Sequence, residues 1–162
     1  MRPDQPASAS IPTKISLEPE ACNCFAVRSA ARHVSQFYDH VLAPTGLRTT
    51  QYSILAKLER LGPLTINGLA DIMVMDRTTL GRNIQPLERD GLIRIEALAS
   101  DRRAKALHLT GAGKKRLQAA LKAWRRAQAQ FETRFGAKRS AELRAILRAL
   151  VGSALQGPAR SD

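Results

Sequence analysis

The feature that most constrains the fold is a pair of short amphipathic segments joined by a tight turn. Apolar residues recur at helical spacing from Ile66 to Met73, directly after Thr65, whose hydroxyl can cap a helix. Asp76 stands where a capping carboxylate would meet the next segment, which ends at Gly91. Two short helices joined so closely predict a helix-turn-helix.

Two stretches of alternating apolar and polar residues follow this pair. In LIRIEAL, residues 92–98, Ile93 and Ile95 alternate with charged residues, and KALHL, residues 105–109, repeats the pattern. This alternation predicts two strands of a β-hairpin, and the connecting ASDRRAK is longer and more basic than a tight turn requires. A helix-turn-helix followed by a hairpin is a winged helix.

Further amphipathic helices are expected on both sides of this unit. We expect one from Glu20 to about Ala43, and one that starts at Thr49 or Thr50, with a threonine hydroxyl as its cap, and ends before Gly62. After Thr110 as cap, a long helix should reach about 135, and a last one should span roughly 140–155. The helices at the two ends carry more apolar surface than one short chain can cover, which favours a homodimer. The fold class is therefore mainly α with a small β-hairpin wing.

The charge of the chain points to an anionic partner. Lys and Arg total 26 against 14 Asp and Glu, a formal net charge of +12 over 162 residues. Such a surface favours nucleic acid, and 4% aromatic residues argue against base-stacking RNA platforms. Residues 1–16 read as a disordered arm rather than a signal peptide, and no apolar run is long enough for a membrane span. We expect a cytoplasmic protein with no membrane contact.

Signatures of enzymes and metal sites are missing from the sequence. It contains no phosphate-binding glycine loop, no zinc signature and no nucleophile elbow, so we expect no catalysis and no cofactor. Cys22, His33 and His40 share a helix face, but the two histidines lie about 10 Å apart along it, too far for one zinc ion. We expect no metal.

The stretch DRRAKALHLTGAG matches a known pattern, D-x-R-x-x-x-L-x-L-T-x-x-G. The matching residues are Asp101, Arg103, Leu107, Leu109, Thr110 and Gly113. With the helix order from about Glu20 to Leu155, the chain resembles the multiple antibiotic resistance regulator (MarR) family of winged-helix transcription factors. The resemblance implies a homodimeric regulator, here expected to be a repressor, on a pseudo-palindromic duplex operator. It divides the chain into an arm (1–17), a dimerisation helix (18–46), a DNA-binding lobe (47–110) and C-terminal dimerisation helices (111–162).

The second helix of the helix-turn-helix should enter the major groove. At 100° per residue, one narrow arc holds its polar residues, and Leu80, Ile84 and Leu87 lie nearly opposite. Arginine can read guanine, glutamine adenine and threonine a thymine methyl, while residues of the first turn suit phosphate. The expected base-facing residues are Thr78, Arg82, Gln85 and Arg89, and the expected phosphate contacts are Arg77 and Thr79.

Three neighbouring features qualify this helix. Gly81 would allow close approach to DNA, Asn83 falls on the core flank, and Pro86 should bend or break the helix near Arg82. The alternative interpretation is a merely solvated helix face, or a nonspecific architectural DNA binder for which net charge alone would suffice.

The wing should add basic contacts. Arg102, Arg103 and Lys105 are spaced for the minor groove or its flanking phosphates. The family resemblance implies that Asp101 pairs with Arg103 to shape the wing, while Arg102 reaches DNA. The alternative is a solvated basic hairpin.

The resemblance also implies release of DNA by a small aromatic acid or phenol, or by thiol oxidation. Pocket candidates by element are Arg28, His33, Phe37, Tyr38, Tyr52 and Trp124, each of which could instead be simply packed or exposed. Arg28 could pair with a ligand carboxylate or with the partner subunit. Cys22 and Cys24 would point about 200° apart on a helix, so an internal disulfide requires fraying, and an intersubunit bridge is the other redox arrangement. We favour two small hydrophobes buried near the dimer contact.

Overall fold

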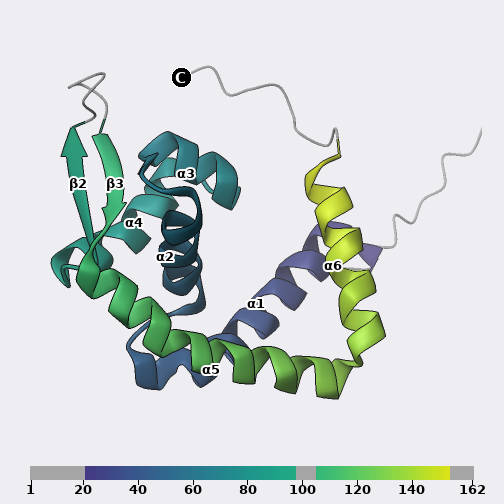
Figure 1. Ribbon diagram of the computed structural model, residues 1–162. Helices are drawn as coiled ribbons and strands as arrows, with labels where there is room; N and C mark the ends of the chain where they lie inside the picture. The colour runs from purple at the N-terminus through teal and green to yellow at the C-terminus, as the bar shows by residue number, and fades with distance from the viewer. Residues whose placement is uncertain (1–20, 98–104, 154–162) are drawn as a thin grey trace, which may run out of the picture. The chain divides into compact units, whose positions relative to one another are not determined.

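The structure is a computed structural model that describes residues 21–97 and 105–153. Figure 1 shows helices joined to one small sheet, which confirms the predicted mainly α class. The elements are α1 (Asn23–Leu42), the 3-10 helix η2 (Ala43–Thr45), α2 (Thr49–Leu61), β1 (Leu64–Thr65), α3 (Ile66–Met73), α4 (Arg77–Arg89), β2 (Ile93–Ala97), β3 (Lys105–Leu109), α5 (Gly111–Phe135) and α6 (Ala137–Val151).

The chain divides into two units between Val34 and Ser35. The described part of the first unit is the start of α1, where the side chains are mostly exposed, Phe25 at 50% and Val27 at 42%. The second unit holds the end of α1 and all the elements that follow it.

The core of the second unit is built from the apolar faces of α2, α3 and α4 with the inner side of the sheet. Because each helix repeats its apolar residues every three or four positions, one face of each is covered. The largest fully buried apolar side chains are Leu42, Ile54, Leu55, Leu69, Leu80, Leu87, Ile93 and Leu107.

Three of the predicted helix caps are confirmed. The Thr65 hydroxyl oxygen accepts from the Gly68 amide at 3.0 Å, and that of Thr110 accepts from the Gly113 amide at 3.0 Å. A carboxylate oxygen of Asp76 accepts from the Thr79 amide at 2.8 Å. These bonds satisfy amides that no helical carbonyl can reach.

The predicted threonine cap of α2 is wrong. The helix does begin at Thr49, but the Thr49 amide donates to Asp39 Oδ1 at 2.6 Å, and the Arg48 amide donates to Gln51 Oε1 at 3.0 Å. Asp39 lies ten residues upstream, so the fold itself brings the cap to the helix.

The sheet contains a strand that the sequence did not reveal. β2 and β3 pair antiparallel as predicted, with Ile95 opposite Leu107, and β1 adds on the other side of β3 with Thr65 opposite Ala106. β3 is therefore the central strand of three. The wing is thus joined to the residue that caps α3.

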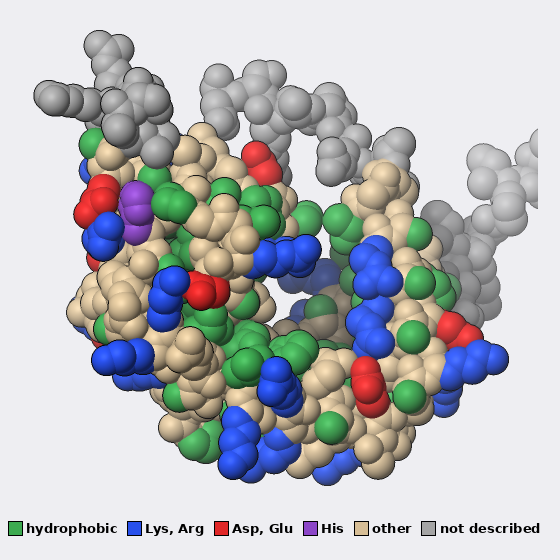
Figure 2. Space-filling view, in the orientation of Figure 1, with side chains coloured by type: hydrophobic (Ala, Val, Ile, Leu, Met, Phe, Trp, Pro, Cys, Tyr) green, Lys and Arg blue, Asp and Glu red, His purple; other side chains and the backbone are tan. Residues whose placement is uncertain are grey.

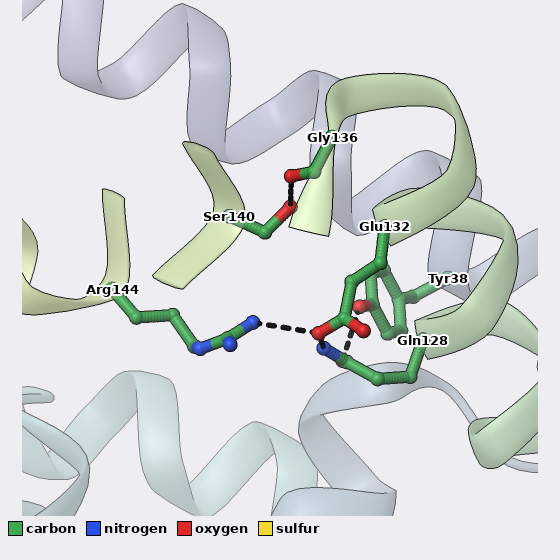
Figure 3. Close-up of polar contacts among 6 residues, drawn as sticks. All are labelled: Tyr38, Gln128, Glu132, Gly136, Ser140 and Arg144. Carbon is green, nitrogen blue, oxygen red and sulfur yellow. Dashed lines mark hydrogen bonds and ion pairs between the residues drawn. The ribbon is translucent and has the colours of Figure 1, made fainter. Parts of the chain in front are cut away.

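The last two helices meet at Gly136. α5 ends at Phe135 as predicted, whereas α6 begins at Ala137, three residues earlier than expected. Ser140, 1% exposed, donates its hydroxyl hydrogen to the Gly136 carbonyl at 2.8 Å (Figure 3). α6 leaves apolar side chains uncovered in the single chain: Ile146, Leu147, Leu150 and Val151. In the described part of the chain, every helix is too short or too polar to cross a lipid bilayer.

Candidate nucleic-acid interface

The turn between α3 and α4 sets the start of the candidate groove helix. Val74 ends α3 in a left-handed conformation, φ 52°, which is costly for a β-branched side chain. Two residues later, Asp76 caps α4, and its second carboxylate oxygen accepts the Thr79 hydroxyl hydrogen at 2.6 Å. These two hydrogen bonds from Thr79 lower the pKa of Asp76, so the cap stays ionised at neutral pH.

α4 separates polar from apolar residues as its period predicts. Leu80, Ile84 and Leu87 are each 3% exposed or less. The side chains of the opposite arc are exposed, and so are those of the first turn: Arg77, Thr78, Thr79, Arg82, Gln85 and Arg89. The predicted outward face is therefore presented on one rigid element.

Two of these exposed residues are already engaged. Thr79 gives its hydroxyl hydrogen to Asp76, which leaves only oxygen lone pairs for another contact. Arg89 forms an ion pair with Asp90 at 3.0 Å, with the arginine side chain 76% exposed. Such an exposed pair is weak, so Arg89 can exchange Asp90 for another anion at little cost.

Asn83 and Pro86 behave as local structure. Asn83 is half-buried and donates its side-chain amide to the Thr79 carbonyl at 2.9 Å, in keeping with a structural role. α4 runs through Pro86 to Arg89, so the helix does not break there. Because proline has no amide hydrogen, the Arg82 carbonyl lacks its helical donor.

Part of the wing lies outside the described residues, namely Asp101, Arg102 and Arg103. Lys105 opens β3 and is exposed. At the base of the hairpin, Glu96 pairs with Arg94 on its own strand and lies 3.7 Å from His108 on β3. Arg94 and Glu96 are exposed and His108 is half-buried, and all three lie on the side of the hairpin away from Ile95 and Leu107.

The six pocket candidates are divided between the two units. Arg28 and His33 belong to the first unit, where both are exposed, and the other four belong to the second. Tyr52 and Trp124 stack with ring centroids 5.9 Å apart and fill space between α2 and α5. For these two residues, the contacts agree with the alternative given above, in which the side chains are simply packed.

Tyr38 belongs to a polar chain that sequence analysis missed. Its hydroxyl donates to Gln128 Oε1 at 2.7 Å, and Gln128 Nε2 donates to Glu132 Oε1 at 2.8 Å. Arg144 on α6 reaches the same carboxylate oxygen at 3.1 Å (Figure 3). Burial, and secondarily Glu132, raises the pKa of Tyr38, so the phenol remains a donor. The chain links the end of α1 with α5 and α6.

Phe37 lies on a different surface. It lines a hollow of about 630 Å³ between the end of α1 and α5, together with His40, Arg126 and Arg134. The Arg134 guanidinium lies 5.7 Å from the centre of the Phe37 ring. The hollow therefore combines an aromatic wall with cationic groups.

Cys22 and Cys24 are free thiols, and both are exposed in the single chain, so the burial that we predict for them near the dimer contact stays a prediction. α1 begins at Asn23, so Cys22 precedes the helix, and its carbonyl accepts from the Ala26 amide at 3.0 Å. The 200° separation expected for two helical residues therefore does not apply to this pair.

Basic side chains dominate the surface. On the face shown in Figure 2, Lys and Arg outnumber Asp and Glu, and several of them lie along the surface formed by α5. An excess of one sign attracts polyanions over a distance of about one Debye length.

The comparisons with known proteins agree on one family. The family model described as MarR family matches residues 47–105. The crystal structure of M. tuberculosis transcriptional regulator MosR is 34% identical, with a TM-score of 0.71, over 84% of this chain and 100% of that chain. MosR in complex with DNA is 37% identical over 83% and 99%, TM-score 0.69. A probable transcriptional regulator from Pseudomonas aeruginosa is 26% identical over 82% and 99%, TM-score 0.72.

No curated protein matches the chain significantly. The winged helix-turn-helix, the wing-region sequence pattern and the likeness to MosR over nearly all of both chains nevertheless lead to one assignment. This chain belongs to the MarR family of transcriptional regulators.

Proposed function

We propose that this protein is a sequence-specific regulator of transcription that binds a pseudo-palindromic duplex operator as a homodimer and represses the genes beside it. The observation that carries the proposal is the two-sided character of α4. Its apolar side is buried against the core, and its polar side is free to contact a base edge or a phosphate.

Each outward residue of α4 has a role that follows from its chemistry. Arg82 carries the fork for guanine O6 and N7, Gln85 can pair with adenine, and Thr78 can touch a thymine methyl. Arg77 lies in the first turn, where phosphate also meets free amides. The Thr79 hydroxyl donates its hydrogen to Asp76, so it can no longer donate to a phosphate. Its oxygen can still accept from a water molecule that bridges to the phosphate.

Gly81 gives independent support for close approach. Nothing lies within 4 Å of the position that a Cβ atom on Gly81 would occupy. Internal packing therefore does not require glycine, which costs a helix about 0.5–1 kcal/mol relative to alanine. Close approach of a duplex to α4 would explain why position 81 has no side chain.

The MosR complex with DNA supports duplex DNA as the partner, because that relative is 37% identical over nearly its whole length. In the wing we assign Lys105, Arg102 and Arg103 to the minor groove or its flanking phosphates. We assign Asp101 to pairing with Arg103, which shapes the wing. The homodimer is supported by the uncovered apolar residues of α6, and we assign 18–46 and 111–162 to subunit contact and 47–110 to DNA.

The test is the affinity of Arg82→Ala for an operator selected from a random duplex library. We expect a loss of about 1–3 kcal/mol for each half-site in specific binding, or about 5- to 150-fold per half-site, and a much smaller loss on nonspecific duplex. Arg60→Ala is the matched control, because it removes an exposed arginine from α2 to which no individual DNA contact and no subunit contact is assigned. Equal losses on both kinds of duplex would indicate the architectural binder instead.

We further propose that a small aromatic acid or phenol releases the DNA. The hollow at Phe37 supports this, because its aromatic wall and the Arg134 guanidinium suit a ring that carries an anionic group. The exposed thiols of Cys22 and Cys24 favour oxidation as the alternative signal. A thermal-shift screen of aromatic acids and peroxide, with DNA release as the second readout, separates the two. Stabilisation by an acid should disappear in Arg134→Ala, whereas a response to peroxide should disappear in a Cys22→Ser, Cys24→Ser variant.

A further inference from the structure

The basic residues of α5 fall into two groups. Three have internal partners in the described residues: Lys114 pairs with Glu59 at 3.3 Å, Arg116 donates to the Thr45 carbonyl at 3.1 Å, and Arg134 lies over Phe37. The other four, Lys115, Lys122, Arg125 and Arg126, form no ion pair or hydrogen bond with any side chain that the structure describes. Arg125 lies to one side of the row formed by Lys115, Lys122 and Arg126. We call these three residues the α5 stripe.

The α5 stripe is a straight row on one side of the helix. Its members are seven and four residues apart, which places them within about 40° of one another at 100° per residue. From Lys115 to Arg126 the row runs about 16 Å along the axis. All three side chains are exposed, and the buried Gly113, Ala120 and Ala127 lie toward the opposite side. Arg126, at the end of the row, also borders the hollow at Phe37.

The residues of α5 that flank the stripe include no acid. They are the alanines Ala112, Ala119 and Ala129 and the long side chains of Gln118, Arg125 and Gln130. The sole carboxylate in α5 is Glu132, which accepts from Gln128 and Arg144. Lys122 and Arg126 are like charges at i and i+4, which weakens a helix. The stripe therefore does not stabilise the protein that carries it.

An anionic partner of regular spacing fits such a row. Duplex DNA carries one negative charge per about 1.7 Å of its axis, and lysine and arginine that neutralise phosphates release bound counterions. A solvated helix face usually mixes both signs at i and i+4 spacing, which this face does not do.

We propose that the α5 stripe binds the sugar-phosphate backbone of duplex DNA flanking the segment read by α4. This inference rests on the proposed function, since it extends the footprint of an operator complex to one exposed side of α5, a helix whose other residues we assign to subunit contact. The stripe contributes affinity and salt dependence without sequence preference, because phosphate contacts carry no base information.

The experiment compares two duplexes that carry the selected operator. One is limited to the operator, and the other is extended by about one helical turn on each side. The variant Lys115→Gln, Lys122→Gln, Arg126→Gln is titrated on both over a range of salt concentrations. On the extended duplex, the homodimer loses six phosphate contacts, so the slope of log K against log salt should become shallower by about 5, at about 0.9 per phosphate contact. On the short duplex, the slope should not change.

The control variant Lys57→Gln, Arg60→Gln, Lys138→Gln removes the same charge outside the stripe and outside the apolar residues of α6, and it should leave both slopes unchanged. Equal slopes for the wild-type protein and the stripe variant on the extended duplex would overturn the inference. So would an equal change on both duplexes, because the stripe would then lie within the operator footprint. Arg82→Ala should weaken binding to the short duplex in every case, and a wild-type protein that selects no operator would refute the proposed function itself.

Discussion

Gly113 is the position where one added methyl group should do most damage to the DNA-binding lobe. A Cβ atom there would lie 2.1 Å from the Leu92 carbonyl oxygen and 2.7 Å from Leu109 Cδ1. An ordinary carbon to oxygen contact is about 3.3 Å, so α5 and the segment before β2 must separate by about 1 Å. The same Leu92 oxygen accepts the Thr110 amide at 3.1 Å and the Thr110 hydroxyl at 3.1 Å.

The magnitude for Gly113→Ala follows from these contacts. The Thr110 hydroxyl keeps its shorter bond to the Gly91 carbonyl at 2.7 Å, so only the amide bond to Leu92 is lost, at a cost of about 1 kcal/mol. Overpacking adds about 1–3 kcal/mol, and the better helix propensity of alanine returns about 1 kcal/mol. We expect a net loss of about 1–3 kcal/mol in the free energy of unfolding.

Urea unfolding of the protein, followed by circular dichroism and by the fluorescence of Trp124, the single tryptophan, measures this loss. Gly111→Ala is the matched control, because nothing lies within 4 Å of its Cβ position, and it should be neutral or stabilising by up to about 1 kcal/mol. If Gly113→Ala were as stable as Gly111→Ala, the close packing of α5 on Leu92 would be refuted.

Two further predictions concern α4 and the polar chain of Figure 3. Gly81→Ala should raise the free energy of unfolding by about 0.5–1 kcal/mol and weaken operator binding at the same time; a gain in stability with unchanged affinity would contradict the close approach. The pKa of Glu132 is lowered from its ordinary 4.5, first by Gln128 and then by Arg144. Its stabilisation is complete above 4.5 and is lost as pH falls through the lowered pKa, so urea unfolding should show wild type losing stability below pH 4.5 relative to Glu132→Gln. Parallel pH profiles for the two proteins would argue against the contact.

The sequence predicted those parts of the fold whose causes are local. A cap such as Thr110 acts on an amide three residues away, and the buried face of α4 follows from helical period alone. From the sequence we predict that Pro86 bends or breaks the helix; α4 does not break there. Its neighbours Ile84 and Leu87 are both buried, and their packing offsets the lost hydrogen bond.

What the sequence did not predict depends on contacts between distant segments. β1 is two residues long, too short for any alternation to be visible, and it exists because β3 pairs with it. Asp39 reaches Thr49 only after η2 turns the chain, and Gln128 meets Tyr38 from 90 residues away. Exposure of the polar arc of α4 followed from the sequence, whereas the Thr79 hydroxyl bond to Asp76 required the geometry of the turn.

The central position of β3 ties the wing mechanically to the helix-turn-helix. Thr65 is opposite Ala106 in the sheet and at the same time caps α3, so a displacement of the hairpin pulls on the first turn of that helix. The hairpin cannot swing away as an independent flap while α3 and α4 stay in place. Departure from a duplex should therefore be a concerted, all-or-none event of the whole lobe, in which groove and backbone contacts are given up together.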